Sequence, residues 1–340
     1  MNKKGIIKKG CTVAGSLAVV GIIIYYFAIP WIIPIKVKGI FIPYDYVLDG
    51  TEVGITRYKG TEEVVKIPNK IMFRDVTKIM CEPQNKYAGT FEGNNFIKKV
   101  VMPDTVKIIE TEAFSECTNL EEISLSANLE EIQMLAFWSC NSLKSINLPD
   151  GLEVISSGVF VLCDSLEKIE IPSTVKEIGD YAFNQCTSLK EVVIPDTISQ
   201  ISGNSFLNTP WYEAQKEDYV VVGDGVLIKY NGIGEVVEIP EGVKYVGYGV
   251  FCNIEEKTEY YKEMEQKYLL PKSLEVIGYM TFPSVNSTKT IVVQNDFMDF
   301  TEDSIYQSEK DDELTIVARE GSTGQKYAEE NGIAWVELED

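Results

Sequence analysis

The chain has 340 residues and a net charge of −21, with 31 Lys and Arg, 52 Asp and Glu and no histidine. Without histidine, a Ser-His-Asp triad, a Cys-His pair and an HExxH zinc site are all excluded. The acidic excess also argues against nucleic-acid binding, since phosphate contacts require clustered Lys and Arg.

The first predicted element is a long apolar helix close to the N-terminus. Residues 10–35 contain no charged side chain, and about 20 to 25 helical residues span roughly 30–37 Å, enough to cross a hydrocarbon core of about 30 Å. More lysines precede this segment than follow it, which favours a cytoplasmic N-terminus. We therefore expect a basic cytoplasmic tail over residues 1–10, a single transmembrane anchor over residues 11–35, and a repeat domain outside the cell.

Two alternatives to the anchor stay open. A cleaved signal peptide would have an apolar region of about 7–15 residues that ends in small residues. The apolar run here is longer, and Phe27-Ala28-Ile29-Pro30 lacks that pattern. The second alternative is a buried helix of a soluble protein. Anchor and signal peptide both place the rest of the chain outside the cytoplasm.

A 23-residue repeat organises the chain beyond a predicted spacer and N-terminal cap at residues 36–58. The unit reads A-F-x-x-C-x-x-L-x-x-I-x-(L/I)-P-x-x-(V/L)-x-x-I. Its clearest columns are Phe114, Phe137, Phe160 and Phe183, then Cys117, Cys140, Cys163 and Cys186, then Leu120, Leu143, Leu166 and Leu189. Such a fixed period is the signature of a solenoid, in which each coil buries its apolar side chains against its neighbours.

The repeat continues with irregular spacing on both sides of these four copies. Phe91 matches one earlier unit, while the steps from Phe206 to Phe251 and from Phe251 to Phe282 are 45 and 31 residues. We predict a solenoid over residues 59–313 with irregular units near residues 207–236 and 253–268, and a C-terminal cap over residues 314–340. The segment L-x-x-I-x-L-P reads as a short strand, and its repetition predicts a parallel sheet.

The cysteine column has three interpretations. The four cysteines are 23 residues apart and no histidine accompanies them, so a zinc site is the weakest of these. Stacked side chains that point the same way suit packing better than disulfide geometry. We predict that these cysteines are small buried apolar side chains, with disulfides as the alternative.

The repeat resembles the leucine-rich repeat of BspA-like bacterial surface proteins over roughly residues 45–340. The similarity rests on pieces such as Ala182-Phe183-Asn184-Gln185-Cys186, Thr209-Pro210-Trp211-Tyr212 and Gly321-Ser322-Thr323-Gly324. The resemblance implies an α/β leucine-rich-repeat solenoid, horseshoe-like and rich in short parallel strands, preceded here by the transmembrane helix. It also implies a non-enzymatic, surface-exposed scaffold used for adhesion or recognition.

Two candidate partner-binding surfaces follow from the repeat. The first is the outer strip, formed by the residues that flank the Ile of each L-x-x-I-x-L strand, which we expect on the concave face: Glu122, Ser124, Ser145, Asn147, Lys168, Glu170, Glu191 and Val193. The second is the insert at residues 253–267, which carries Tyr260 and Tyr261 among glutamates. Each has a plain alternative, a merely solvated face for the strip and a surface helix for the insert.

Motifs for catalysis and for cofactors are missing from the sequence. It has no P-loop, no G-x-G-x-x-G and no EF-hand spacing, so we predict no enzyme, no cofactor and no metal site, with weak calcium binding by the acidic surface as a minor alternative. The predicted function is a membrane-anchored, cell-surface scaffold that binds a protein or another macromolecule. The alternative is a structural module of the cell envelope without a specific ligand, and an enzyme is the weakest hypothesis.

Overall fold

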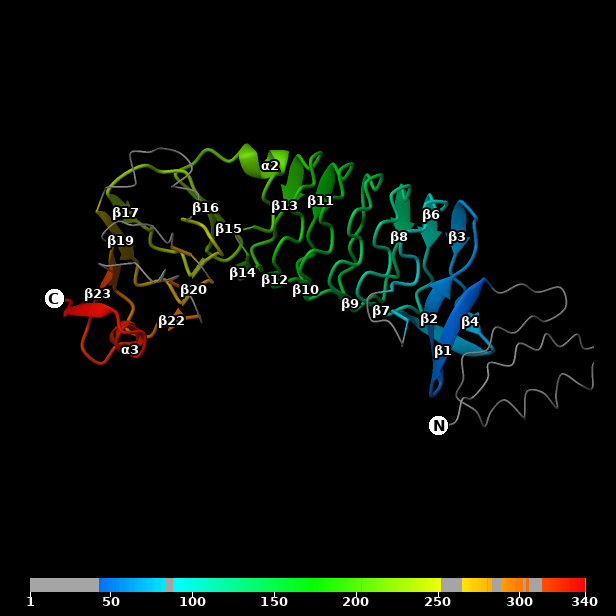
Figure 1. The fold of residues 1–340 in the computed structure, drawn as a ribbon, viewed down its shortest axis with the longest axis horizontal. Helices are drawn as coiled ribbons and strands as arrows, with labels where there is room; N and C mark the ends of the chain where they lie inside the picture. Colours follow the sequence, from blue (N-terminus) through cyan, green and yellow to red (C-terminus); the bar gives the residue numbers. More distant parts are fainter. Residues whose placement is uncertain are drawn as a thin grey trace, which may run out of the picture.

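The computed structural model describes residues 43–82, 88–202, 204–251, 265–279, 281–282, 289–301, 304–305 and 314–339. Within them the chain winds as a solenoid, and most coils contribute two short strands that lie on opposite sides of the coil (Figure 1). Strands of successive coils are parallel and hydrogen-bonded, so they form two rows.

The two rows run along the solenoid. The inner row consists of β2 (Glu52–Tyr58), β5 (Arg74–Ile79), β7 (Ile108–Ile109), β9 (Glu131–Ile132), β10 (Val154–Ile155), β12 (Glu177–Ile178), β14 (Gln200–Ile201), β16 (Val226–Tyr230), β18 (Tyr245–Val246), β20 (Val276–Ile277) and β22 (Asp299–Phe300). The outer row consists of β3 (Val64–Lys66), β6 (Lys99–Val101), β8 (Glu122–Ser124), β11 (Lys168–Glu170), β13 (Glu191–Val193), β17 (Val236–Glu238), β19 (Gln266–Leu270), β21 (Lys289–Val293), β23 (Leu314–Ala318) and β24 (Ala334–Glu337).

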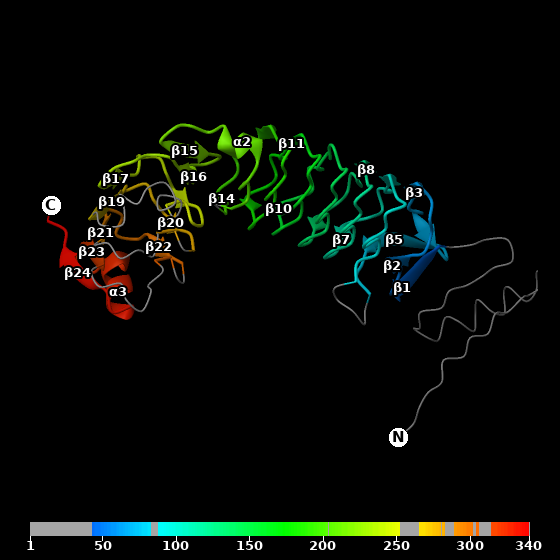
Figure 2. The same cartoon turned by 45° about the horizontal axis from the view of Figure 1, so that its top comes forward.

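The solenoid is bent into an arch. Figure 2 shows the inner row along the concave side of the arch and the outer row along its convex side. A solenoid bends toward the side on which successive coils lie closer together, so its curvature depends on the difference in coil spacing between the two sides.

The core of the regular coils is a ladder of stacked rings. Ring centroids from Phe91 through Phe206 are 4.7 to 5.5 Å apart, and successive rings are within 14° of parallel. All of these side chains are fully buried or nearly so. Because the step is a constant 23 residues, each ring lies over the equivalent ring of the next coil and no gap opens between them.

Each buried cysteine of the ladder makes a hydrogen bond to the neighbouring coil. The Cys140 thiol donates to the Phe114 carbonyl oxygen at 3.2 Å, and Cys163 donates to Phe137 in the same way at 3.2 Å. Cys117 and Cys186 bond to the coil before their own at 3.0 and 3.1 Å. The cysteine column therefore gives a buried carbonyl in each coil a donor that an aliphatic side chain would lack.

The two ends of the solenoid are closed differently. At the N-terminal end, β1 (Tyr44–Asp49) forms an antiparallel hairpin with β2, and the Tyr58 ring lies 5.2 Å from Phe91, at the end of the ring ladder. The short strand β4 (Lys70–Ile71) pairs with β5 beside this hairpin. At the C-terminal end, α3 (Thr323–Glu330) begins at the capping hydroxyl of Ser322, and Tyr327 on this helix stacks on Phe300 at 4.3 Å.

An interruption after residue 206 divides the core into two apolar clusters. Helix α2 (Pro210–Glu213) begins at Thr209, whose hydroxyl caps it, and the strand β15 (Tyr219–Val222) pairs antiparallel with β16. The inner row continues past this point through contacts of β14 with β16, whereas the outer row has no described strand between β13 and β17.

The fold-class prediction needs correction. The described residues form a β-solenoid, not an α/β fold, and their helices are α2 and α3, with 4 and 8 residues. No helix of the described residues is long and apolar enough to cross a membrane. The predicted tail at residues 1–10 and the predicted anchor at residues 11–35 lie outside the described residues.

The backbone explains why the connections are turns. In the regular coils the residue before each cysteine has a positive φ, as in Glu116, Ser139, Leu162 and Gln185, all between 56° and 61°. A second left-handed residue lies four positions earlier in most coils, for example Leu135 and Tyr181. Left-handed residues end a right-handed helix, so the A-F-x-x-C segment turns instead of forming the helix of an α/β unit.

Candidate binding surfaces

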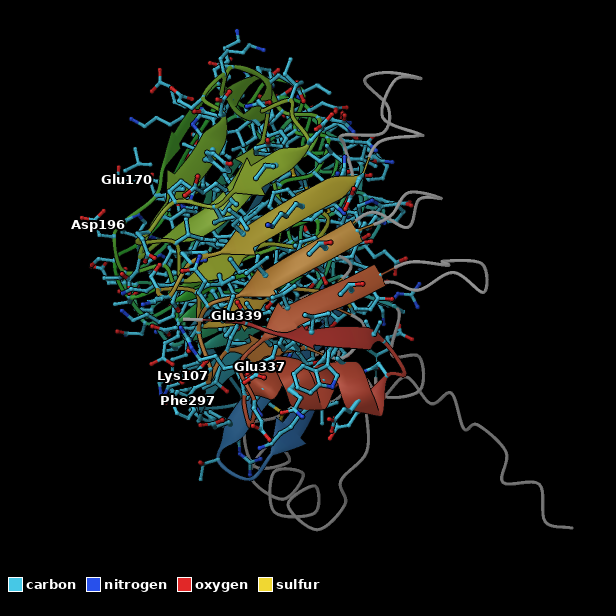
Figure 3. All side chains as sticks on the ribbon, turned by 90° about the vertical axis from the view of Figure 1, so that its left-hand side faces the viewer. Lys107, Glu170, Asp196, Phe297, Glu337 and Glu339 are labelled. Carbon is cyan, nitrogen blue, oxygen red and sulfur yellow. The ribbon has the colours of Figure 1, made fainter. Side chains whose placement is uncertain are left out.

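The outer strip lies on strands of the outer row. Glu122 and Ser124 flank buried Ile123 in β8, and Lys168 and Glu170 flank buried Ile169 in β11. Ser145 forms an isolated bridge with Lys168, and Glu191 lies next to Lys168 in the β11–β13 register. Figure 3 shows the Glu170 side chain projecting away from the ribbon. The strip is thus a continuous column of exposed side chains.

The prediction that the outer strip lines the concave face is wrong. Its strands belong to the convex side of the arch (Figure 2). The repeat pattern predicts outward-pointing residues on both rows equally well. It contains no information about which row has the closer coil spacing, and that spacing sets the curvature.

Charges of the outer strip face one another across coils. Lys99 Nζ donates to Glu122 on the next coil, and Lys168 Nζ lies 3.7 Å from a Glu191 carboxylate oxygen. Both pairs are solvent-exposed. Exposed ion pairs contribute about 0–1 kcal/mol each to stability, so these contacts order the strip without neutralising it strongly.

The second candidate surface is not described. Tyr260 and Tyr261 lie within residues 252–264, outside the described residues. The recognition role of this insert therefore stays a prediction.

The ladder residues are inaccessible to a partner. Phe114, Phe137, Phe160 and Phe183, with their companion cysteines, have no exposed surface. Burial raises the pKa of the Cys117 and Cys186 thiols to about 12 and that of Cys140 and Cys163 well above the ordinary value. These thiols are protonated near neutral pH and therefore lack the thiolate that nucleophilic or metal-binding cysteines need.

Metal and disulfide chemistry can be examined only in the described residues. There, Cys81, Cys117, Cys140, Cys163 and Cys186 are all free thiols. In the same part of the chain, no group of three or more Cys, Asp or Glu side chains is placed to hold a metal ion.

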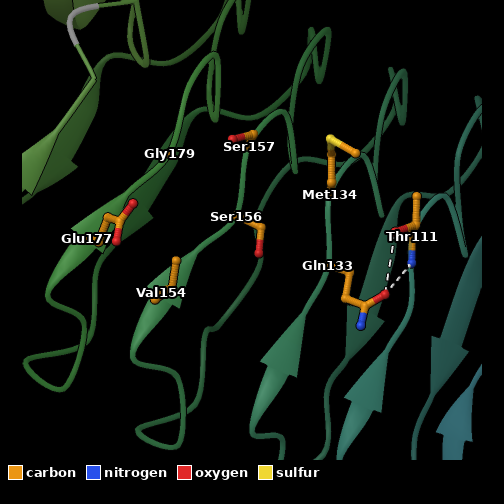
Figure 4. A pocket seen from close by; sticks show the side chains of 8 residues that line it. All are labelled: Thr111, Gln133, Met134, Val154, Ser156, Ser157, Glu177 and Gly179. Atoms are coloured by element: carbon orange, nitrogen blue, oxygen red, sulfur yellow. Dashed lines mark hydrogen bonds between the residues drawn. The ribbon is translucent and has the colours of Figure 1, made fainter. Parts of the chain in front are cut away.

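The concave face of the regular coils carries a shallow depression of about 370 Å³. Gln133 lies at its centre and accepts hydrogen bonds from the backbone N–H and the hydroxyl of Thr111 at 3.2 and 3.4 Å (Figure 4). The lining residues are Thr111, Gln133, Met134, Val154, Ser156, Ser157, Glu177 and Gly179. This mixture of short polar, apolar and single acidic side chains can contact a partner but lacks a nucleophile paired with a base.

The concave side of the C-terminal coils has an aromatic pair that the sequence analysis missed. Tyr248 and Tyr279 each follow the buried residue of an inner-row strand by two positions, as Met134 and Ser157 do. Their rings stack at 5.6 Å, and Tyr279 is 45% exposed. The 31-residue step between them is visible in the sequence, and aligning the coils at that step would have found the pair.

Three comparisons place the chain among known proteins. Residues 86–211 and 230–319 match the family described as BspA type Leucine rich repeat region, in six copies. A search of curated proteins found no match.

Similar solved structures are bacterial repeat proteins. The Leucine Rich Repeat protein of T. pallidum is 30% identical over 50% of this chain and 87% of its own, with a TM-score of 0.43. A leucine rich cell surface protein of Faecalibacterium prausnitzii is 19% identical over 90% and 94%, with a TM-score of 0.46. A leucine-rich repeat protein of Bacteroides ovatus is 22% identical over 82% and 70%, with a TM-score of 0.47.

The family match covers more than half of the chain and coincides with the ring ladder, the cysteine column and the two rows of strands. The chain therefore belongs to the BspA-type leucine-rich-repeat family.

Proposed function

We propose that this chain is a cell-surface scaffold that binds a protein or another macromolecule and catalyses no reaction. The observation that carries the proposal is the outer strip, a column of exposed polar side chains held in register across successive coils. Stacked repeats typically use such extended surfaces for recognition. Membership in a family of surface-type repeat proteins supports the same role.

The outer strip is the proposed contact surface. Its side chains stand on hydrogen-bonded strands above a tightly packed core, so their spacing is rigid before binding, and little conformational entropy is lost when a partner docks. The strip carries both signs of charge together with Ser145 and Asn147, and this combination suits a polar partner surface of complementary pattern.

A pull-down with the immobilised full chain tests the proposal. We expect a saturable partner from envelope extracts that is lost when Glu122, Asn147 and Glu170 are all changed to Ala. The matched control changes Glu131, Glu153 and Gln200 to Ala, which are also exposed but belong to the inner row or its approach. Equal loss in both variants, or no saturable partner at micromolar concentration, would contradict the proposal.

A structural envelope module without a ligand is the second candidate. The ion pairs Lys99–Glu122 and Lys168–Glu191 favour it, because they satisfy strip charges within the molecule. Under this alternative the strip variant would bind as the control does, and its main effect would be a small loss of stability.

A further inference from the structure

The outer row of the C-terminal coils presents a different surface from the outer strip. Strands β17, β19, β21, β23 and β24 form one parallel sheet, and Figure 3 looks onto it, with the strands side by side from yellow to red. Buried Val237, Tyr268, Ile291 and Ile316 point into the core from four of these strands. The residues between them therefore point outward.

These outward residues form two columns in register. The first column is Val236, Lys267, Thr290, Thr315 and Ala334, and the second is Glu238, Leu269, Val292, Val317 and Val336. We call these ten residues the C-terminal outer face. Val236 and Val336 are 54% and 55% exposed, although both could have been polar without disturbing the core.

The composition of this face stands out against the rest of the outer row. Four aliphatic residues lie side by side in its second column, whereas the corresponding positions of the regular coils include Ser124, Asn147 and Glu170. Contiguous exposed apolar surface on a soluble domain usually marks an interaction site. The sheet also ends in an edge strand, β24, beyond which the described residues contain no further strand of this row.

Charge indicates which partner fits this face. The chain carries a net charge of −21, so two copies repel each other wherever acidic surfaces meet. The C-terminal outer face contains one positive and one negative side chain, Lys267 and Glu238. A second copy can approach this face without net repulsion.

The geometry of the face is self-complementary. A two-fold axis that runs across the strands would place each strand antiparallel over its own counterpart, so that the first column of one copy lies over the second column of the other. The short side chains Thr290, Thr315 and Ala334 would then lie opposite valines. Lys267 of each copy would lie beside Glu238 of the other, because these residues are on adjacent strands in opposite columns. Two symmetric ion pairs result, as an isologous interface requires.

We propose that the chain forms a two-fold dimer through its C-terminal outer face, with the two sheets packed face to face. Five strands at a spacing of about 4.8 Å make the face roughly 19 Å across. Interfaces of this size lie at the weak end of the range for specific complexes. The dimer is therefore expected to assemble and dissociate with concentration.

Sedimentation velocity of the full chain across the micromolar range tests the proposal. Wild type should shift from monomer to dimer as its concentration rises, and Val317→Lys/Val336→Lys should remain monomeric. The matched control, Ser124→Lys/Asn147→Lys, adds the same charges to the outer row of the regular coils and should dimerise as wild type does. A wild-type monomer throughout, or equal behaviour of the two double variants, would overturn the proposal.

Charge reversal tests the two-fold geometry at exposed positions that do not affect folding. Lys267→Glu should raise the dimer dissociation constant by about tenfold. Adding Glu238→Lys to it should restore the wild-type value, because each pair is then re-formed with its signs exchanged. If the double reversal stays as weak as Lys267→Glu alone, the proposed arrangement is wrong.

Discussion

The regular coils and the C-terminal coils solve the same packing problem in different ways. In the regular coils, every step is 23 residues, the strands have two or three residues, and the rings of the core are nearly parallel. Across the C-terminal sheet, paired residues are 31, 23, 25 and 19 positions apart, and three of its strands have five residues. Its core mixes stacked Phe251 and Phe282 with Tyr268 set edge-on to Phe282 at 4.8 Å.

The difference shows what a constant step provides. Equal coils place identical side chains over each other, so a single ladder fills the core and polar residues occupy the outside. Unequal coils cannot maintain such a ladder, and here longer strands bury mixed side chains instead. The outside of those longer strands is the apolar C-terminal outer face, which lacks the cross-coil ion pairs of the outer strip.

The largest expected effect comes from a gap in the ring ladder. Phe160→Ala removes a fully buried ring that stacks on both neighbours and should lower the free energy of unfolding by about 3–5 kcal/mol. Hydrogen exchange should show the loss of protection in the regular coils before residues 265–339. Phe297→Ala, at an 88% exposed position, should cost below about 0.5 kcal/mol. Similar costs for the two variants would refute the ladder's role.

Alkaline pH should weaken the regular coils through the buried thiols. The pKa of Cys186 is raised to about 12 in the fold, so its contribution to stability is complete below about pH 9 and is lost as the pH rises toward 12. Because one proton is involved, Cys186→Ala should reduce the pH dependence of the unfolding free energy by about 1.4 kcal/mol per pH unit in this range. Denaturant titrations between pH 8 and 11 measure it. Thr187→Ala, at the adjacent exposed position, should retain the wild-type slope, and identical slopes in all three proteins would contradict the prediction.

A smaller gain is expected at a left-handed turn residue. Gln185 is exposed and has a φ of 59°, which strains a residue with a Cβ atom by about 1–2 kcal/mol. Gln185→Gly should raise the free energy of unfolding by about 0.5–1 kcal/mol after the greater freedom of glycine in the unfolded chain is subtracted. Chemical denaturation measures the change. Lys190→Gly, outside the left-handed region, should instead lose stability, and a loss in both variants would count against the strain.

The smallest effect concerns the outer strip. A double-mutant cycle with Lys99→Ala and Glu122→Ala should give a coupling energy of about 0.2–1 kcal/mol, because both side chains are exposed. The coupling should decrease as salt is raised from low to molar concentration. A coupling that exceeds this range and resists salt would mean that the strip is a structural clamp and not a solvated surface.

The sequence by itself determined the repeat and its buried columns. Phe114, Cys117, Leu120 and Ile123 recur at a constant step, and any stack of such coils must bury them together. It also determined which residues of the outer strip point outward, since side chains alternate along a strand.

The tertiary structure decided the rest. The left-handed turns fall on Glu, Ser, Leu and Gln, residues that carry no local signal for that conformation, so the absence of an α/β helix was not visible in the sequence. The curvature that moved the outer strip to the convex side depends on coil spacing over many units. The C-terminal outer face appears only when unequal steps bring Leu269, Val292, Val317 and Val336 into one register, because periodicity identifies neighbours only where the step is constant.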